Sequence, residues 1–126
     1  MLILRNCQKL FSFFIKKRGE KFDFIFGDLT DIPLDPEHSK ASKDTWDFLR
    51  SILTLGMQLI IPNTGKYLTH YNGKSVPSKY ISKYEEMLHD LRVESDPSLR
   101  PIFKHWESYV PSFFETWIFY KISMCN

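Results

Sequence analysis

The apolar residues of the chain follow two alternating patterns, one typical of strands and one of helices. Residues 22–26 are apolar at four of five positions and run directly into Gly27. This near-continuous apolar character is typical of a strand buried on both faces, as in a parallel sheet. Aromatic and β-branched residues predict further strands at 66–71, 102–106 and 116–122.

Helical periodicity occurs before the first of these strands and in the two segments that separate the first three. Apolar residues recur at intervals of three and four positions, which predicts helices over 7–18, 44–60 and 78–91. Asp44 is a candidate N-cap for the second helix, and Ser75 or Ser78 for the third. The segment 28–43 has neither period and contains two prolines, so we expect a long loop directly after the first strand.

The order of the predicted elements indicates the fold class. Strands alternate with helices, which predicts an α/β fold with a parallel sheet and right-handed crossovers. The last two strands are joined through the short connection at Pro111–Ser112, so they form an antiparallel hairpin at one edge. The 126 residues suffice for a single core of ordinary size.

Composition and charge exclude several classes of protein. The chain is 43% hydrophobic and 25% charged, with a net charge of +2, which excludes disorder and by itself implies neither nucleic acid nor a membrane surface as partner. Cys7 and Cys125 form no disulfide framework or zinc motif, and the four histidines share no ligand spacing. We expect a soluble cytoplasmic protein without a bound metal, because no long apolar or signal-like segment opens the chain.

Two acids at the start of the long loop are the first candidates for chemistry. Asp28 and Asp31 follow the strand 22–26 directly, and ligands of open α/β sheets bind outside the carboxyl ends of strands. The pair could act as a general base and its companion, or hold a cation. Alternatively, both are turn-forming aspartates that bond their own backbone.

The segment 22–33 (FDFIFGDLTDIP) resembles the active-site strand and loop of the aminopropyltransferases, in particular those of the spermine synthase type. The similarity extends over roughly residues 4–122, in the same order and with similar spacing. The resemblance implies the carboxyl-terminal half of a Rossmann-like, methyltransferase-type sheet. Residues 1–126 would then be a partial catalytic domain without its N-terminal nucleotide-binding half. The further matching blocks are 44–53 (DTWDFLRSIL), 65–69 (GKYLT) with Asn72, Tyr84–Glu85, and 110–120 (VPSFFETWIFY).

The resemblance also implies a reaction and roles for individual residues. Aminopropyl would pass from decarboxylated S-adenosylmethionine, a co-substrate, to spermidine, giving spermine and methylthioadenosine without a tightly bound cofactor. Asp28 matches the proton acceptor and Asp31 a second acid of the loop. Glu115 matches the acid that holds the polyamine, and Phe113 stands where the family commonly has tyrosine. Asn6–Cys7 lines up with an Asp–Cys pair that contacts adenine.

Other interpretations remain open at this point. His70–Tyr71 stands where the family usually has Gln–Gly, a departure close to the ligand edge of the sheet. The chain could be an inactive polyamine-binding or interaction remnant of the family, or a methyltransferase-like domain of another specificity. Polyamine and decarboxylated S-adenosylmethionine are the expected partners, with a homodimer formed through a region preceding this chain.

Overall fold

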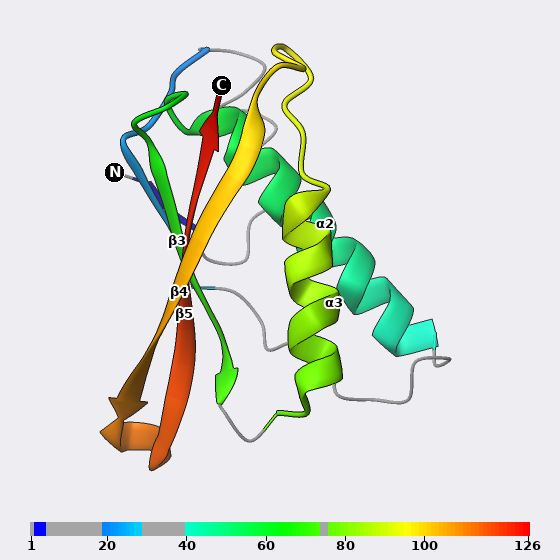
Figure 1. Cartoon of the computed structure of the whole chain (residues 1–126), viewed down its shortest axis with the longest axis vertical. Helices are drawn as coiled ribbons and strands as arrows, with labels where there is room; N and C mark the ends of the chain where they lie inside the picture. The colour runs from blue at the N-terminus through cyan, green and yellow to red at the C-terminus, as the bar shows by residue number, and fades with distance from the viewer. Residues whose placement is uncertain (1, 5–18, 29–39, 74–75) are drawn as a thin grey trace.

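The computed structural model describes residues 2–4, 19–28, 40–73 and 76–126, and it is a mixed α/β fold (Figure 1). The predicted helix 7–18 and most of the predicted loop lie outside these residues. The elements, in chain order, are β1 (Leu2–Leu4), β2 (Phe24–Gly27), α2 (Lys40–Leu59), β3 (Lys66–Gly73), α3 (Ser78–His89), β4 (Arg100–Val110), the short 3-10 helix η1 (Pro111–Phe113) and β5 (Glu115–Cys125).

The sheet combines parallel and antiparallel pairing. Its strand order is β1-β2-β3-β5-β4, four strands extended at one edge by the three residues of β1. The pairs β1–β2 and β2–β3 are parallel, whereas β5 is antiparallel to both β3 and β4. The alternation of strands and helices and the terminal hairpin are therefore confirmed, while β1 falls on residues for which the sequence predicted no element.

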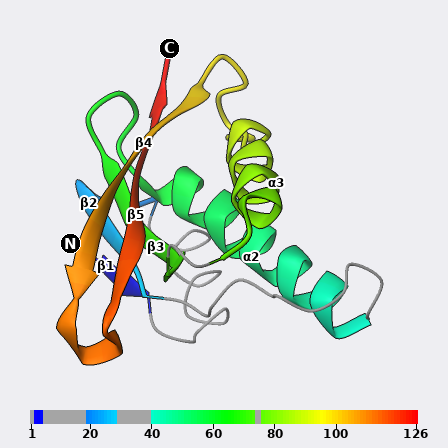
Figure 2. The ribbon, with the colours of Figure 1, turned by 60° about the horizontal axis from the view of Figure 1, so that its bottom comes forward.

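Both helices pack on the same face of the sheet (Figures 1 and 2). Every second residue of β2, β3, β4 and β5 points toward them, and the buried ones form the core together with the apolar stripes of the helices. None of the helices in the described ranges is long and apolar enough to cross a membrane. The most deeply buried members of the core are Ile25, Met57, Leu59, Ile60, Tyr67, Tyr71, Leu88, Leu99, Tyr120, Ile122 and Met124.

The prediction that the strand 22–26 is buried on both faces is wrong for this structure. Ile25 is fully buried against the helices, but Phe24 and Phe26 are 47% and 37% exposed. Successive side chains of a strand point to opposite faces, and the described helices cover only one of them. We call the uncovered side, opposite α2 and α3, the open face.

Element boundaries also differ from the prediction. The second helix begins at Lys40, so Asp44 lies inside it and cannot be its N-cap. The third begins at Ser78, so Ser78 lies inside it and is not its N-cap, and Ser75 lies outside the described residues. The N-cap is Pro77, whose side chain has no group that could accept a hydrogen bond, so this helix has no side-chain cap. Strands β4 and β5 each have 11 residues, since pairing across the hairpin extends the ladder through polar positions that carry no strand signal.

The ring of Tyr67 on β3 is confined by two glycines. Its ring lies between Gly27 at the end of β2 and Gly56 of α2, where a Cβ atom would come within 2.7 Å of Cζ and Cδ2 of the ring, respectively. Neither position can take a side chain unless the fully buried ring moves. The two glycines therefore set how closely α2 approaches the sheet beside Gly27.

We expect Gly56→Ala to lower the free energy of unfolding by about 1–3 kcal/mol, the usual cost of overpacking. Alanine favours helix over glycine by about 1 kcal/mol, so a net loss reports the clash with Tyr67. Urea denaturation measures the change. The matched control, Ser51→Ala at an exposed position of the same helix, should stay within about 0.5 kcal/mol of the parent. Equal midpoints for both variants would contradict the confinement of Tyr67.

Four tyrosines of the core have pKa values raised above the ordinary value. Burial is the main cause at Tyr67, Tyr71, Tyr84 and Tyr120, and at Tyr120 the hydrogen bond to Glu85 and the charge of that carboxylate raise the pKa further. Each of these pKa values is higher in the folded than in the unfolded protein, so the tyrosines contribute to the free energy of unfolding in their neutral form. This contribution is complete below about pH 10 and is lost as the pH rises.

We therefore predict that alkali unfolds the protein with a dependence set by these tyrosines, about 1.4 kcal/mol per pH unit for each group that ionises only on unfolding. Tyr67→Phe should have an equal or higher unfolding free energy at pH 7, because the Tyr67 hydroxyl has no hydrogen-bond partner. Its advantage over the parent should widen above about pH 10. Urea unfolding along a pH series tests this, and parallel curves for the two proteins would contradict it.

Candidate functional site

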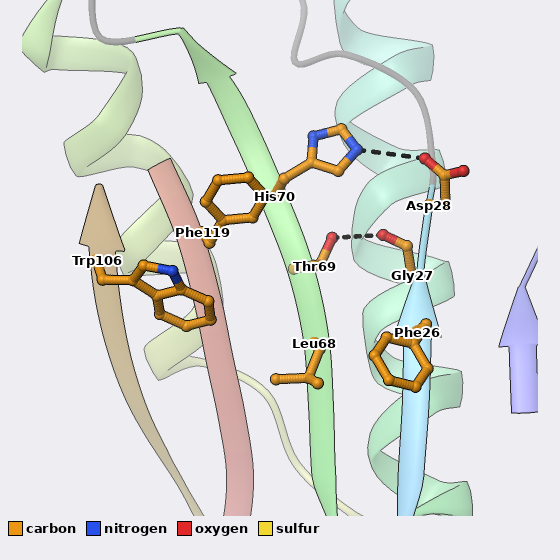
Figure 3. Close-up of a pocket in the computed structure, with 8 residues that line it drawn as sticks. All are labelled: Phe26, Gly27, Asp28, Leu68, Thr69, His70, Trp106 and Phe119. Carbon is orange, nitrogen blue, oxygen red and sulfur yellow. Dashed lines mark hydrogen bonds and ion pairs between the residues drawn. The ribbon is translucent and has the colours of Figure 1, made fainter. Parts of the chain in front are cut away.

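A hollow of about 330 Å³ lies on the open face, where β2 ends beside β3 (Figure 3). Figure 3 looks onto this face, and the helices lie behind the sheet. Apolar and aromatic side chains form most of its wall, with one carboxylate and one imidazole at its rim. The lining residues are Phe26, Gly27, Asp28, Leu68, Thr69, His70, Trp106 and Phe119.

The pairing of β2 with β3 positions the polar rim. Gly27 is in register with Thr69, and the Thr69 hydroxyl donates a 2.9 Å hydrogen bond to the Gly27 carbonyl. This bond fixes the backbone directly before Asp28. His70 Nε2 then lies 3.4 Å from Asp28 Oδ1, with the Asp28 side chain 63% exposed. Asp28 is thus anchored beside His70, with most of its side chain exposed.

Two further rings, those of Trp117 and Phe113, continue from His70 toward the hairpin. The His70 and Trp117 ring centroids are 4.9 Å apart, and Trp117 stacks on Phe113 at 4.4 Å with an interplanar angle of 24°. A bulge between Tyr71 and Gly73 of β3 lies opposite this part of β5. We call His70, Trp117 and Phe113 the ring series.

Glu115 belongs to the same end of the open face. It begins β5 and is half-buried, and alternation along the strand places it on the face of Trp117 and Phe119. From the row of Asp28 it lies about 13 Å along the strands and about 10 Å across them, which separates the two Cα atoms by about 16 Å. The ring series lies between these acids.

This arrangement suits an elongated polycation. Two carboxylates at a distance from each other can each bind an ammonium group through a charge-assisted hydrogen bond. Aromatic faces between them attract cationic groups and cover the connecting methylenes. A separation of this size is comparable with the length of an extended polyamine chain. The apolar wall of the hollow completes a surface on which such a chain could lie.

The structure brings together three of the residues selected from the sequence. Asp28, Phe113 and Glu115 share the open face at the carboxyl ends of β2 and β3, whereas Asn6, Cys7 and Asp31 lie outside the described residues. Trp117 is half-buried in the ring series, and its indole Nε1 has no hydrogen-bond partner.

His70 and Glu85 show what the resemblance could and could not indicate. His70 departs from the family pattern at the ligand edge, and this departure was the one sequence signal pointing to its place beside Asp28. Glu85 lies in the other layer, where it accepts a 2.9 Å hydrogen bond from the Tyr120 hydroxyl and lies 3.2 Å from His105 Nδ1. The matched pair Tyr84–Glu85 therefore supports the core rather than the hollow.

The chain was also compared with known protein families. No protein-family model matches it. In the described part of the chain, no three histidine, cysteine, aspartate or glutamate side chains gather as metal ligands. The chemistry proposed below rests on the arrangement of the chain's own side chains and on the resemblance of the segments quoted above.

We predict that Asp28→Asn changes the ring resonances of His70, because His70 Nε2 lies against the Asp28 carboxylate. Proton–nitrogen correlation spectra of the imidazoles measure this change. The signals of His89, whose ring packs against Phe103, serve as an internal reference. Glu94→Gln, which removes an exposed acid outside the hollow, should leave His70 unmoved. An unchanged His70 spectrum in Asp28→Asn would contradict the contact.

Proposed function

We propose that this chain supplies the polyamine-binding side of a spermine-synthase-like aminopropyl transfer. Spermidine would be the acceptor, decarboxylated S-adenosylmethionine the donor, and spermine and methylthioadenosine the products. One observation carries the proposal: Asp28 and Glu115 lie on one face at the same end of the sheet, with the ring series between them. The resemblance of segments 22–33 and 110–120 to aminopropyltransferases supports the same assignment.

The two acids would have different tasks. Glu115 would pair with an ammonium group of the polyamine remote from the reaction and so fix the position of the chain along the ring series. Asp28 would face the amine that reacts. Phe113 has no hydroxyl, so its contribution is limited to its ring face over the methylenes, and Asp31, assigned a role by resemblance alone, remains a proposed second acid.

The reaction explains why a carboxylate must stand beside the reacting amine. An alkylamine with a pKa near about 10.4 is protonated at pH 7, and freeing its lone pair costs about 4.6 kcal/mol. Asp28 would accept that proton while the nitrogen lone pair attacks the methylene next to the sulfonium. The carbon–sulfur bond breaks, its electron pair returns to sulfur, and neutral methylthioadenosine leaves.

The proposed fold assignment follows from the same pattern. A parallel β2–α2–β3 unit followed by an antiparallel hairpin is compatible with the carboxyl-terminal half of a Rossmann-like sheet. The acids then lie where such sheets bind ligands, at the carboxyl ends of the strands. Asn6 and Cys7 would contact the adenine of the donor, a role that rests on the resemblance alone.

A second candidate is a polyamine-binding module without transfer activity. His70 Nε2 already lies against one oxygen of Asp28, an arrangement that suits ion pairing with a bound cation and leaves less of the carboxylate for proton transfer. The two candidates share the acids and the ring series. They differ in whether methylthioadenosine is released.

Calorimetric titration with spermidine tests binding, and release of methylthioadenosine tests transfer. We expect Glu115→Gln to weaken spermidine binding by about 10- to 100-fold, the loss of one charge-assisted contact. Asp28→Asn should lower turnover by about 10²–10⁴-fold, the range for a lost acid–base group. Glu94→Gln, which removes the same charge outside the hollow, should change neither quantity.

The outcomes separate the candidates. Binding that depends on Glu115 without any release of methylthioadenosine would support the binding module and overturn the transfer. Turnover unchanged by Asp28→Asn would remove the role assigned to that residue. Spermidine binding that is absent, or equal in the parent and in Glu115→Gln, would overturn both.

A further inference from the structure

Three neighbouring strands contribute a cluster of lysines to the open face, on the side of Asp28 away from the hairpin. Lys104 of β4 lies directly opposite Lys121 of β5, and Lys121 lies opposite Leu68 of β3. Lys66 is two residues before Leu68, which makes it the diagonal neighbour of Lys121. Its ammonium donates a 2.9 Å hydrogen bond to the Ser123 hydroxyl. We call Lys66, Lys104 and Lys121 the basic row.

The described residues leave part of the positive charge of the basic row without an ion-pair partner. Like charges directly opposite each other on adjacent strands are destabilising. In the part of the chain that the structure describes, no carboxylate forms an ion pair with Lys104 or Lys121. An anion that bridges the two ammonium groups would relieve this repulsion.

Flat aromatic surfaces adjoin the basic row on the same face. Trp106 is 46% exposed, lies opposite Phe119 on β5, and stacks on it with ring centroids 5.7 Å apart. Phe26 and Phe24 continue the aromatic surface on β2, and Figure 3 shows Phe26, Phe119 and Trp106 around one hollow. Each ring is within two residues along the strands of a lysine of the basic row.

We propose that the open face binds a single strand of nucleic acid. Bases have flat faces that stack on exposed aromatic rings, and the phosphates that connect them match a row of lysines. The helices of the described residues cover only the other side of the sheet, so β2, β3, β5 and β4 present exposed rings and lysines to such a strand. The net charge of +2 does not indicate this site, because it sums over the whole chain whereas the lysines of the basic row are clustered on one face.

The charges favour a nucleic acid over a second copy of the chain. A copy packed on this face would bury Lys104 and Lys121, and each would then need a carboxylate partner. Of the acids assigned to this face, Asp28 already lies 3.4 Å from His70 Nε2, and Glu115 also takes part in an interaction within its own chain. A single strand instead brings one phosphate with every base, so its bases would stack on the rings while its phosphates pair with the lysines.

Fluorescence anisotropy with labelled oligo-dT and oligo-U, without polyamine, tests the proposal. We expect a dissociation constant of about 10⁻⁶–10⁻⁴ M at physiological salt, and a log–log slope against salt of about −2 for three neutralised phosphates. Lys104→Gln combined with Lys121→Gln should reduce the slope to about −0.7. Trp106→Leu should weaken binding by about 5- to 150-fold through the loss of one stacked base.

Matched controls come from the opposite side of the protein. Lys79→Gln removes one exposed lysine of α3, and Tyr109→Leu removes an exposed aromatic ring from the other face of β4. Both should bind the oligonucleotides like the parent. Asp28→Asn should not weaken them either, although the proposed polyamine function predicts that it impairs turnover, so the two proposals can fail separately.

Three results would overturn the inference. The first is no binding at low salt by a protein whose urea unfolding is normal. The second is binding that Trp106→Leu and the double lysine variant leave unchanged while Lys79→Gln reduces it. The third is a dimer in sedimentation equilibrium that Trp106→Leu dissociates, which would show that a second copy covers the face.

Discussion

The antiparallel pairing of β3 with β5 is the interaction on which both proposed sites depend. It joins residues 66–73 to residues 115–125, and it brings Lys66 to Ser123 and His70 to Trp117 on the open face. In one direction the register places Phe119 beside His70 and Trp117 beside Gly73, close to Asp28. In the other it places Lys121 beside Leu68, and the hairpin then adds Lys104. A shift of one residue would turn all of these β5 side chains to the helix-covered face.

The described helices cover only one face of the sheet, so the pairing of β3 with β5 builds a core on one side and an exposed surface on the other. On the helix side the core closes around Tyr67, which the two glycines on β2 and α2 confine, and burial raises the pKa values of the core tyrosines. On the open face the same strands expose aromatic rings. A chain with this many aromatic residues can fill its core and still expose rings on the other face, where they are available to flat or cationic ligands.

Acidic and basic side chains adjoin the hollow on the open face. Asp28 is at the rim of the hollow and Glu115 lies nearer the hairpin. Lys121 and Lys104 lie in the row of Leu68, on the side of Asp28 away from the hairpin. The acids are complementary to a polyamine and the lysines to a phosphate chain, and both ligand classes would use the aromatic surface of the hollow.

The sequence by itself determined the local features. Apolar period and turn residues gave the strand 22–26, both described helices and the terminal hairpin, because such signals depend on neighbours in the chain, and they placed Asp28 directly after a strand. Only the tertiary structure decided which strands are neighbours and which face is covered. The sequence pattern therefore predicted Phe24 and Phe26 to be core residues, although both are exposed. His70 and Trp117 lie together at the candidate site only because β3 pairs with β5. Lys66, Lys104 and Lys121 became one row because a register joins residues that are distant in sequence, and no local pattern encodes that register.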